Sequence, residues 1–202
     1  MSAVASLVFA AGRGTRMKGY SGNKTLLPLI PAKSCYQGAH PLIREVLDNL
    51  PAGPRGIVVN YLAEEVRRVT EGQGISFVYQ PVTNGTGGAL LAARSFLDSA
   101  DADRVIITMG DVPLIRSATY FRLLELLGRC QLALLAFECK DRGQYGMIEM
   151  EGEQVTGIVE WKYWKDFPLE RKSSLRYCNA GVYAAGKTTL LRYLSKVVFP
   201  AA

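Results

Sequence analysis

The sequence predicts an α/β protein with a doubly wound, mostly parallel sheet and a later β-hairpin extension. Short apolar runs alternate with helical periodicity through the first two thirds of the chain, which is typical of consecutive strand–helix–strand units. The first run, residues 4–10, is apolar on both faces, as expected of a strand buried in a parallel sheet. Three runs end in polar or glycine-rich segments, which would share the rim at the carboxyl ends of the strands.

The other elements follow in order along the chain. One helical face carries five apolar side chains, at Leu42, Ile43, Val46, Leu47 and Leu50. We therefore expect a helix over 39–50, ended by the prolines and glycine of 51–54. Further helices are expected over 62–71, 89–97, 117–129 and 187–196. Further strands are expected over 55–61, 75–79, 104–108, 131–137 and 176–184.

The pattern changes after residue 144. Residues 145–150 and 154–161 alternate between apolar and polar side chains on either side of a glycine turn, which predicts a hairpin. The charged and aromatic segment 161–172 is compatible with helix or loop. Its aromatic residues could stack on a ligand ring, although packing is their commoner role.

Composition and charge limit the classes of function. The chain has 202 residues, is 49% hydrophobic and 21% charged, and is therefore expected to fold as one globular domain. A net charge of +6 suits nucleic acid, an acidic membrane face or a polyanionic small molecule. Lysine and arginine form no long run, so we favour a local phosphate site and expect neither nucleic acid nor membrane as partner.

The cysteines indicate a reducing compartment. Cys35, Cys130, Cys139 and Cys178 form no CxxC pair and have no zinc-binding spacing. The N-terminal apolar run lacks a basic leader and a cleavage site, and no run is long enough to span a bilayer. We therefore expect a cytoplasmic protein.

The loop after the first run has the chemistry of a phosphate site. Glycines at positions 12 and 14 allow backbone N–H groups to approach an anion, and three cations lie nearby, at Arg13, Arg16 and Lys24. A dinucleotide fingerprint is a poor alternative, because Met17 replaces its third glycine and Asn60 stands where an acidic residue is needed. The alternative without a ligand is a tight turn with exposed arginines.

A second glycine pattern, Gly-x-x-x-x-Gly-Lys-Thr, spans residues 181–188. A P-loop follows a strand, whereas residues 182–184 are themselves expected to be strand. We interpret the match as chance, with Lys187 and Thr188 opening a helix.

Two further segments lie at predicted strand ends. Gln80 precedes the glycine loop 81–88 and could hydrogen-bond a base edge or only end a strand. Asp111 suits Mg²⁺, which is held by one or two carboxylates plus substrate phosphates, but it could equally cap a turn. His40, the single histidine, precedes Pro41 at a predicted helix start, where a surface or capping role is expected.

Taken together, these residues resemble the nucleotidyltransferases that make nucleotide sugars. Within that group it resembles the uridylyltransferase domain of bacterial bifunctional N-acetylglucosamine-1-phosphate uridylyltransferases. Ordered motifs carry the resemblance, at residues 10–17 with Lys24, 80–87, 110–114, 145–146, 155–160 and 179–181. It implies a Rossmann-like fold and Mg²⁺-dependent attack of a sugar-1-phosphate, with N-acetylglucosamine-1-phosphate expected, on the α-phosphorus of an NTP, with UTP expected. Pyrophosphate is released.

The resemblance also implies roles for individual residues. Nucleotide-binding roles fall to Ala10, Ala11, Gly12, Gly14, Thr15, Gln80, Gly85 and Thr86. Catalytic roles fall to Arg16 and Lys24, and Asp111 would hold Mg²⁺. The sugar would be contacted by Gly146, Glu160 and Asn179, with the hairpin over the sugar side.

The resemblance further implies one nucleotidyltransferase domain over 1–202, with a nucleotide half at about 1–115 and a sugar half at 116–202. We expect a monomer or weak oligomer without the acetyltransferase β-helix domain. The chain departs from the family at Asn23, where proline is usual, at Met109, and in an apparent insertion at 31–40. No residue matches the family's late asparagine, its second metal ligand. A non-catalytic nucleotide-binding module and a cytidylyl- or guanylyltransferase are the alternatives.

Overall fold

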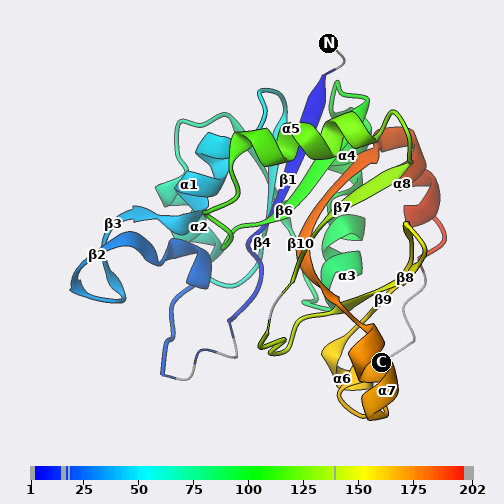
Figure 1. Cartoon of the computed structure of the whole chain (residues 1–202). Coiled ribbons are helices and arrows are strands. Elements are labelled where there is room, and N and C mark those ends of the chain that lie inside the picture. Colours follow the sequence, from blue (N-terminus) through cyan, green and yellow to red (C-terminus); the bar gives the residue numbers. More distant parts are fainter. Residues whose placement is uncertain (1–2, 15–16, 18, 139, 198–202) are drawn as a thin grey trace. The chain divides into compact units, whose positions relative to one another are not determined.

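The computed structural model describes residues 3–14, 17, 19–138 and 140–197 (Figure 1). The chain forms two compact units, and each is described by itself. The first unit comprises residues 1–133 and 183–202, and the second comprises residues 134–182. The domain division expected from the sequence stays a prediction.

Parallel strands form the sheet of the first unit, in the order β5 (Ile75–Tyr79), β4 (Arg55–Val59), β1 (Val4–Phe9) and β6 (Arg104–Met109). In the register, Val8 of β1 lies opposite Ile57, and Leu7 lies opposite Ile107. Residues 183–186 of β10 (Tyr177–Gly186) add an antiparallel strand beside β6. The mostly parallel sheet predicted from the sequence is confirmed.

Helices cover both faces of this sheet (Figure 1). One face packs against α3 (Thr86–Ala92), α4 (Arg94–Ser99) and α8 (Lys187–Leu194) in a core that includes alternate β1 residues, Ala5, Leu7 and Phe9. This alternation is the period-2 pattern of a strand that buries both faces.

The opposite face meets α5 (Ser117–Leu126), whose Tyr120 hydroxyl lies 3.2 Å from the Thr108 hydroxyl of β6. Buried apolar side chains of α1 (Leu42–Asn49) and α2 (Ala63–Val69) complete the helical layers, at Ile43, Val46, Leu47 and Val66. The doubly wound arrangement is therefore confirmed.

The segment before α1 differs from the sequence prediction. The expected helix start at residue 39 and the insertion expected at 31–40 both lie in a hairpin, β2 (Pro28–Ser34) and β3 (Gln37–Pro41). The helix expected from residue 39 begins only at Leu42, because His40 has a left-handed φ of 56° and belongs to β3. The helix expected over 89–97 is two helices, α3 and α4, which meet at Ala93.

The pattern at residues 181–188 has no P-loop geometry. Residues 181–186 lie in β10, and α8 begins at Lys187. A phosphate-binding loop would have to separate the strand from the helix, so the interpretation as a chance match is confirmed.

The second unit contains most of β7 (Leu132–Glu138), all of β8 (Met147–Glu151) and β9 (Gln154–Val159), and β10 up to residue 182. The first two residues of β7 belong to the first unit. The predicted hairpin is confirmed, since β8 and β9 pair antiparallel. Short helices α6 (Trp161–Trp164) and α7 (Leu169–Ser174) follow. The buried core of the unit is small, at Met147, Trp164, Leu175 and Cys178. Within the described residues, every helix is too short or too polar to cross a bilayer.

Candidate functional site

The carboxyl ends of β1, β5 and β6 meet at a cavity of about 220 Å³ in the first unit. Its lining comes from residues 10–14 after β1, which we call the glycine loop, and from residues 80–85 after β5, which we call the Gln80 loop. Lys24, Thr25 and Met109 also line it. The structure thus brings together two of the segments predicted to share one rim. Ligand sites in open α/β sheets lie at this edge.

The glycine loop is shaped by two glycines with different surroundings. Gly14 has a left-handed φ of 62°, and a Cβ placed there would lie 3.6 Å from Cβ of Lys24. A Cβ placed at Gly12 would meet no atom within 4 Å. The loop therefore packs over the stem of Lys24 at Gly14 and leaves open space at Gly12.

The other predicted loop residues are in part described. Ala10 and Ala11 are buried and line the cavity. The Arg13 guanidinium lies 5.5 Å from the centre of the Tyr61 ring. Thr15 and Arg16, predicted to bind nucleotide and to act in catalysis, lie outside the described residues.

Asn23 anchors the chain immediately before Lys24. Its side chain is fully buried, and its Nδ2 donates to the carbonyls of Ala10 and Tyr61, each at 3.0 Å. Its Oδ1 accepts from the backbone N–H of Thr25 at 3.0 Å and from its hydroxyl at 2.9 Å. Asn23 is thereby the N-cap of the short turn η1 (Lys24–Leu26). In the sequence, Asn23 was noted only as a departure from the family pattern, although asparagine directly before a helical turn is an N-cap signal.

Lys24 and Asp111 form an ion pair, with 2.6 Å between Nζ and Oδ2. Both side chains are partly exposed, at 31% and 25%. Close packing fixes the strand end that carries Asp111, because a Cβ at Gly110 would lie 2.9 Å from Cγ2 of Thr25. The Gly110 N–H also donates to the Phe9 carbonyl at 3.0 Å. Residues predicted separately as catalytic and metal-binding are therefore neighbours.

The Gln80 loop is held by its own side chains. Gln80 is 4% exposed, and its Nε2 donates to Oδ1 of Asn84 at 3.3 Å and to the Gly85 carbonyl at 3.4 Å. Its backbone carbonyl accepts from Nδ2 of Asn60 at 2.7 Å. Gly85 has a φ of 92° and precedes α3, whose first residue, Thr86, is exposed. Gln80 thus shapes the loop as well as lining the cavity.

The residues predicted to contact the sugar lie together in the second unit. The Asn179 N–H donates to the Gly146 carbonyl at 2.8 Å. A Cβ placed at Gly146 would lie 3.5 Å from Oε1 of Glu160. Oδ1 of Asn179 accepts from the Gly181 N–H at 3.0 Å. Glu160 is exposed, so its carboxylate is accessible to a hydroxyl-bearing ligand.

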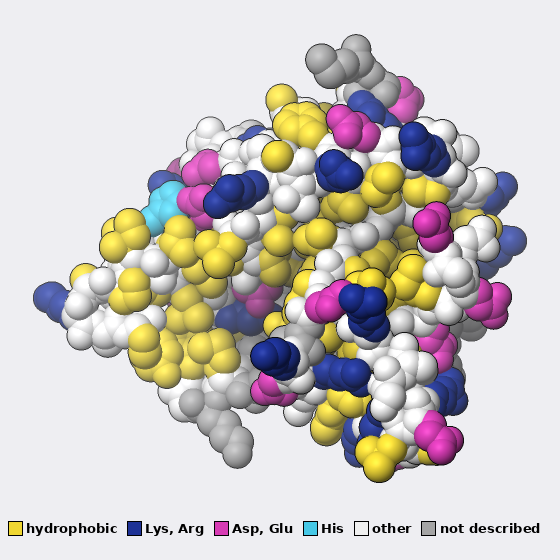
Figure 2. Space-filling view, viewed as in Figure 1, with side chains coloured by type: hydrophobic (Ala, Val, Ile, Leu, Met, Phe, Trp, Pro, Cys, Tyr) yellow, Lys and Arg dark blue, Asp and Glu magenta, His cyan; other side chains and the backbone are white. Residues whose placement is uncertain are grey.

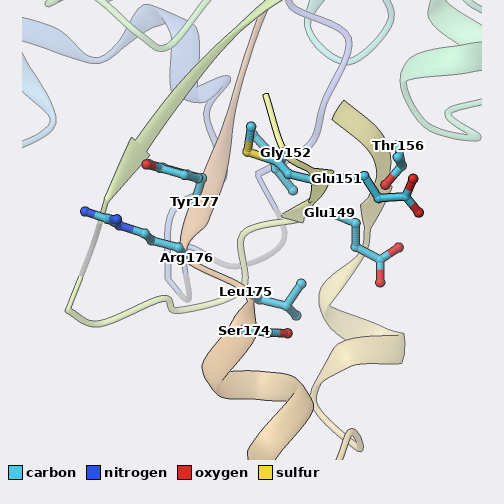
Figure 3. Close-up of a pocket in the computed structure, with 10 residues that line it drawn as sticks. Glu149, Glu151, Gly152, Thr156, Ser174, Leu175, Arg176 and Tyr177 are labelled. Atoms are coloured by element: carbon cyan, nitrogen blue, oxygen red, sulfur yellow. The ribbon is translucent and has the colours of Figure 1, made fainter. Parts of the chain in front are cut away.

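A larger cavity of about 520 Å³ lies elsewhere in the second unit (Figure 3). Glu149 and Glu151 of β8 line one side, and Arg176 and Tyr177 line another (Figure 3). Gly146, Glu160 and Asn179 are not in its lining. Two of its lining charges are paired, since Arg171 bonds Glu149 at 2.9 Å and Arg176 bonds Glu138 at 2.8 Å.

Metal ligands are sparse at the rim. Among the described residues, Asp111 belongs to no group of three closely spaced histidine, cysteine or acidic side chains. Such a group occurs instead at His40, Glu45 and Asp48, where Nε2 of His40 lies 2.7 Å from Oε2 of Glu45. His40 is half-buried and paired with Glu45, and a surface or capping role for it stays a prediction.

Charges are interspersed on the face shown in Figure 2, where lysine and arginine side chains stand among acidic ones. Apolar side chains gather over the β2–β3 hairpin on the same face (Figure 2). Ile30 and Tyr36 of this hairpin segment are exposed.

A mostly parallel sheet with a glycine loop, a lysine and an aspartate at one rim defines a Rossmann-like α/β protein with a candidate ligand site at that rim. Solved structures of the same fold include HddC from Yersinia pseudotuberculosis, with a TM-score of 0.67 and 22% identity over 96% of this chain and 80% of that one. Another is the CMP:2-keto-3-deoxy-manno-octonic acid synthetase complexed with CTP, with a TM-score of 0.68 and 15% identity over 98% of this chain and 80% of that one.

Residues 6–160 match the family described as MobA-like NTP transferase domain, and the chain belongs to this family. It is similar to the bifunctional protein GlmU of Chromohalobacter salexigens, with 34% identity over 195 residues, and to that of Cereibacter sphaeroides, with 35% over 199 residues. These matches cover 95% and 96% of this chain but 40% and 41% of the relatives. The chain thus spans about two fifths of the length of these curated relatives. By family it is a nucleotidyltransferase, as the sequence resemblance predicted.

Proposed function

We propose that the chain transfers a nucleotidyl group from an NTP to a sugar-1-phosphate and releases pyrophosphate. UTP and N-acetylglucosamine-1-phosphate are the proposed substrates. The Lys24–Asp111 pair carries the proposal, because a cation and a carboxylate stand together beside a glycine-loop cavity. The identity to bifunctional GlmU proteins supports it.

The reaction is a substitution at the α-phosphorus. An oxygen of the acceptor phosphate bonds to that phosphorus, and the bond to the bridging oxygen of pyrophosphate breaks with its electron pair. The acceptor is already an anion, so no strong general base is needed. Catalysis then rests on positioning and on neutralising the developing charge, a role proposed for Lys24 and Arg16.

The cavity is smaller than most ligand pockets, which enclose roughly 300–1,000 Å³. Its volume of about 220 Å³ suits part of a nucleotide. We assign the base to the Gln80–Thr86 side and the phosphates to Gly12, Gly14 and Lys24. Gly146, Glu160 and Asn179 of the second unit are the proposed acceptor contacts.

The donor chemistry at Asp111 fits Mg²⁺, a hard cation that is commonly held by one or two carboxylates plus substrate phosphates. Bound there, Mg²⁺ would neutralise charge on the triphosphate. Lys24 balances the Asp111 charge in this structure, and a bound phosphate would offer Lys24 a second anionic partner. A cytoplasmic location and a monomer or weak oligomer remain our predictions.

The test is a pyrophosphate-release panel with Mg²⁺, in which UTP, CTP and GTP are each combined with several sugar-1-phosphates. The expected result is fastest release with UTP and N-acetylglucosamine-1-phosphate. Asp111→Asn, which keeps the side-chain shape and removes its charge, should lower the rate at least about 100-fold. Faster release with CTP or GTP would assign the chain to a cytidylyl- or guanylyltransferase. NTP-induced thermal stabilisation without release from any pair would indicate a binding module and contradict the proposal.

A further inference from the structure

Asn23 uses every hydrogen-bonding capacity of its carboxamide inside the protein. The amide group has two N–H donors, and its oxygen can accept two hydrogen bonds. Both donors reach backbone carbonyls, of Ala10 and Tyr61, at 3.0 Å each. Both acceptor positions are taken by Thr25, through its N–H and its hydroxyl. A fully buried amide that is satisfied in this way has one favourable orientation, which fixes the backbone that carries it.

The partner of Asn23 connects it to the base side of the cavity. Tyr61 follows β4, and its hydroxyl donates to the Ser21 carbonyl in the segment before Asn23. The neighbouring residue, Asn60, donates from Nδ2 to the backbone carbonyl of Gln80 at 2.7 Å. Asn23, Asn60 and Tyr61 form what we call the polar frame, which joins the start of the η1 turn to the start of the Gln80 loop.

We propose that Asn23 is a positioning residue that fixes Lys24 relative to the Gln80 loop through this polar frame. The inference rests on the proposed function. Lys24 follows Asn23 directly and is the first residue of the turn that Asn23 caps. A displacement of about 1 Å at a reacting centre can lower a rate by about 100-fold.

The decisive variant is Asn23→Ser, which keeps a short acceptor for the N-cap and removes the donations to Ala10 and Tyr61. The matched control is Asn49→Ala. It removes the two hydrogen bonds that Asn49 Nδ2 donates within α1, to the Glu45 carbonyl at 2.9 Å and to its Oε1 at 3.0 Å. It also removes the hydrogen bond that Asn49 Oδ1 accepts from the Ser117 hydroxyl at 3.4 Å. We expect Asn23→Ser to lower kcat about ten- to hundred-fold at a temperature where both variants are folded, and Asn49→Ala to leave kcat unchanged.

A double-mutant cycle separates positioning of Lys24 from general loosening. If Asn23 acts through Lys24, Asn23→Ser should cause no further loss of kcat in a Lys24→Ala background. Equal fold-losses in the wild-type and Lys24→Ala backgrounds would overturn the proposal, because the effect would then be independent of Lys24.

Amide hydrogen exchange without substrate gives a readout that does not depend on turnover. Asn23→Ser should increase exchange in peptides covering residues 10–26 and 80–86, and Asn49→Ala should not. Unchanged exchange at both segments, or an increase spread evenly over the protein, would overturn the polar frame. If the wild type released no pyrophosphate, only the proposed function would be contradicted. The hydrogen-exchange result would still show whether the polar frame holds the two segments.

Discussion

Gly12 offers a substitution that separates the ligand site from the fold. A Cβ at Gly12 would meet no atom within 4 Å, and the φ of Gly12 lies outside the left-handed region. Alanine should therefore change the free energy of unfolding by less than about 1 kcal/mol. Gly12 lines the cavity, so the added methyl group would occupy space that a phosphate needs to approach the backbone. We expect the Kd for UTP to rise about ten- to hundred-fold, or about 1.4–2.8 kcal/mol.

Calorimetric titration with UTP, paired with urea unfolding, measures both quantities. Gly53→Ala is the matched control, because a Cβ there would lie 2.1 Å from the Val4 carbonyl oxygen at a φ of 144°. This control should lose about 1–3 kcal/mol of stability and keep wild-type UTP affinity while it is folded. Wild-type UTP affinity in Gly12→Ala, or a loss in proportion to its lost stability, would refute the reasoning.

Two further predictions concern Lys24 and Tyr120. Lys24→Ala should lower the rate of pyrophosphate release about 10²–10³-fold, while the free energy of unfolding changes by no more than about 1 kcal/mol, because the ion pair is partly exposed. A retained rate would contradict its catalytic role. Burial raises the pKa of the Tyr120 hydroxyl above about 10, although its hydrogen bond with Thr108 acts in the opposite direction. The unfolded tyrosine therefore loses its proton first, and stability should fall as pH rises above about 10. Tyr120→Phe should remove this alkaline loss and lower the free energy of unfolding by about 1 kcal/mol at neutral pH. A difference in free energy of unfolding between wild type and Tyr120→Phe that stays constant from pH 8 to 11 would refute the assignment.

The sheet could be predicted because its signals are local. Residues 75–79 are rich in β-branched and aromatic side chains and lie between Gly74 and the Gln80–Pro81 pair. The strand has the bounds 75–79 in the structure. The position of the candidate site could be predicted from the strand–helix–strand order, because parallel strands bring their carboxyl ends to one edge of the sheet. The same rule placed the glycine loop, the Gln80 loop and Asp111 at that edge.

The hairpin over 28–41 could not be predicted in the same way. Its strands contain prolines and mostly exposed side chains, so they show no clear alternation of apolar and polar residues. The helix expected over 39–50 also overlapped its end. The spacing of apolar residues carries no signal for the left-handed conformation at His40, which keeps the helix from starting before Leu42.

The pairings within the site depend on tertiary structure. Sequence reasoning placed Lys24 and Asp111 at one rim, but it gave no indication that they bond directly. Asn23 is similar, because one partner, Tyr61, lies 38 residues away along the chain. Hydrogen bonds between distant segments have no periodic signature, so only their residue types were visible in the sequence.

Transfer of the nucleotidyl group with its α-phosphate is the central claim, and following that phosphorus tests it most directly. The wild-type protein would be incubated with Mg²⁺, N-acetylglucosamine-1-phosphate and UTP labelled at either the α- or the γ-phosphate. We predict that the α-label enters a nucleotide sugar and that an equal amount of γ-label appears in pyrophosphate. Release of the γ-label as inorganic phosphate, or recovery of the α-label only in UTP, would contradict the account.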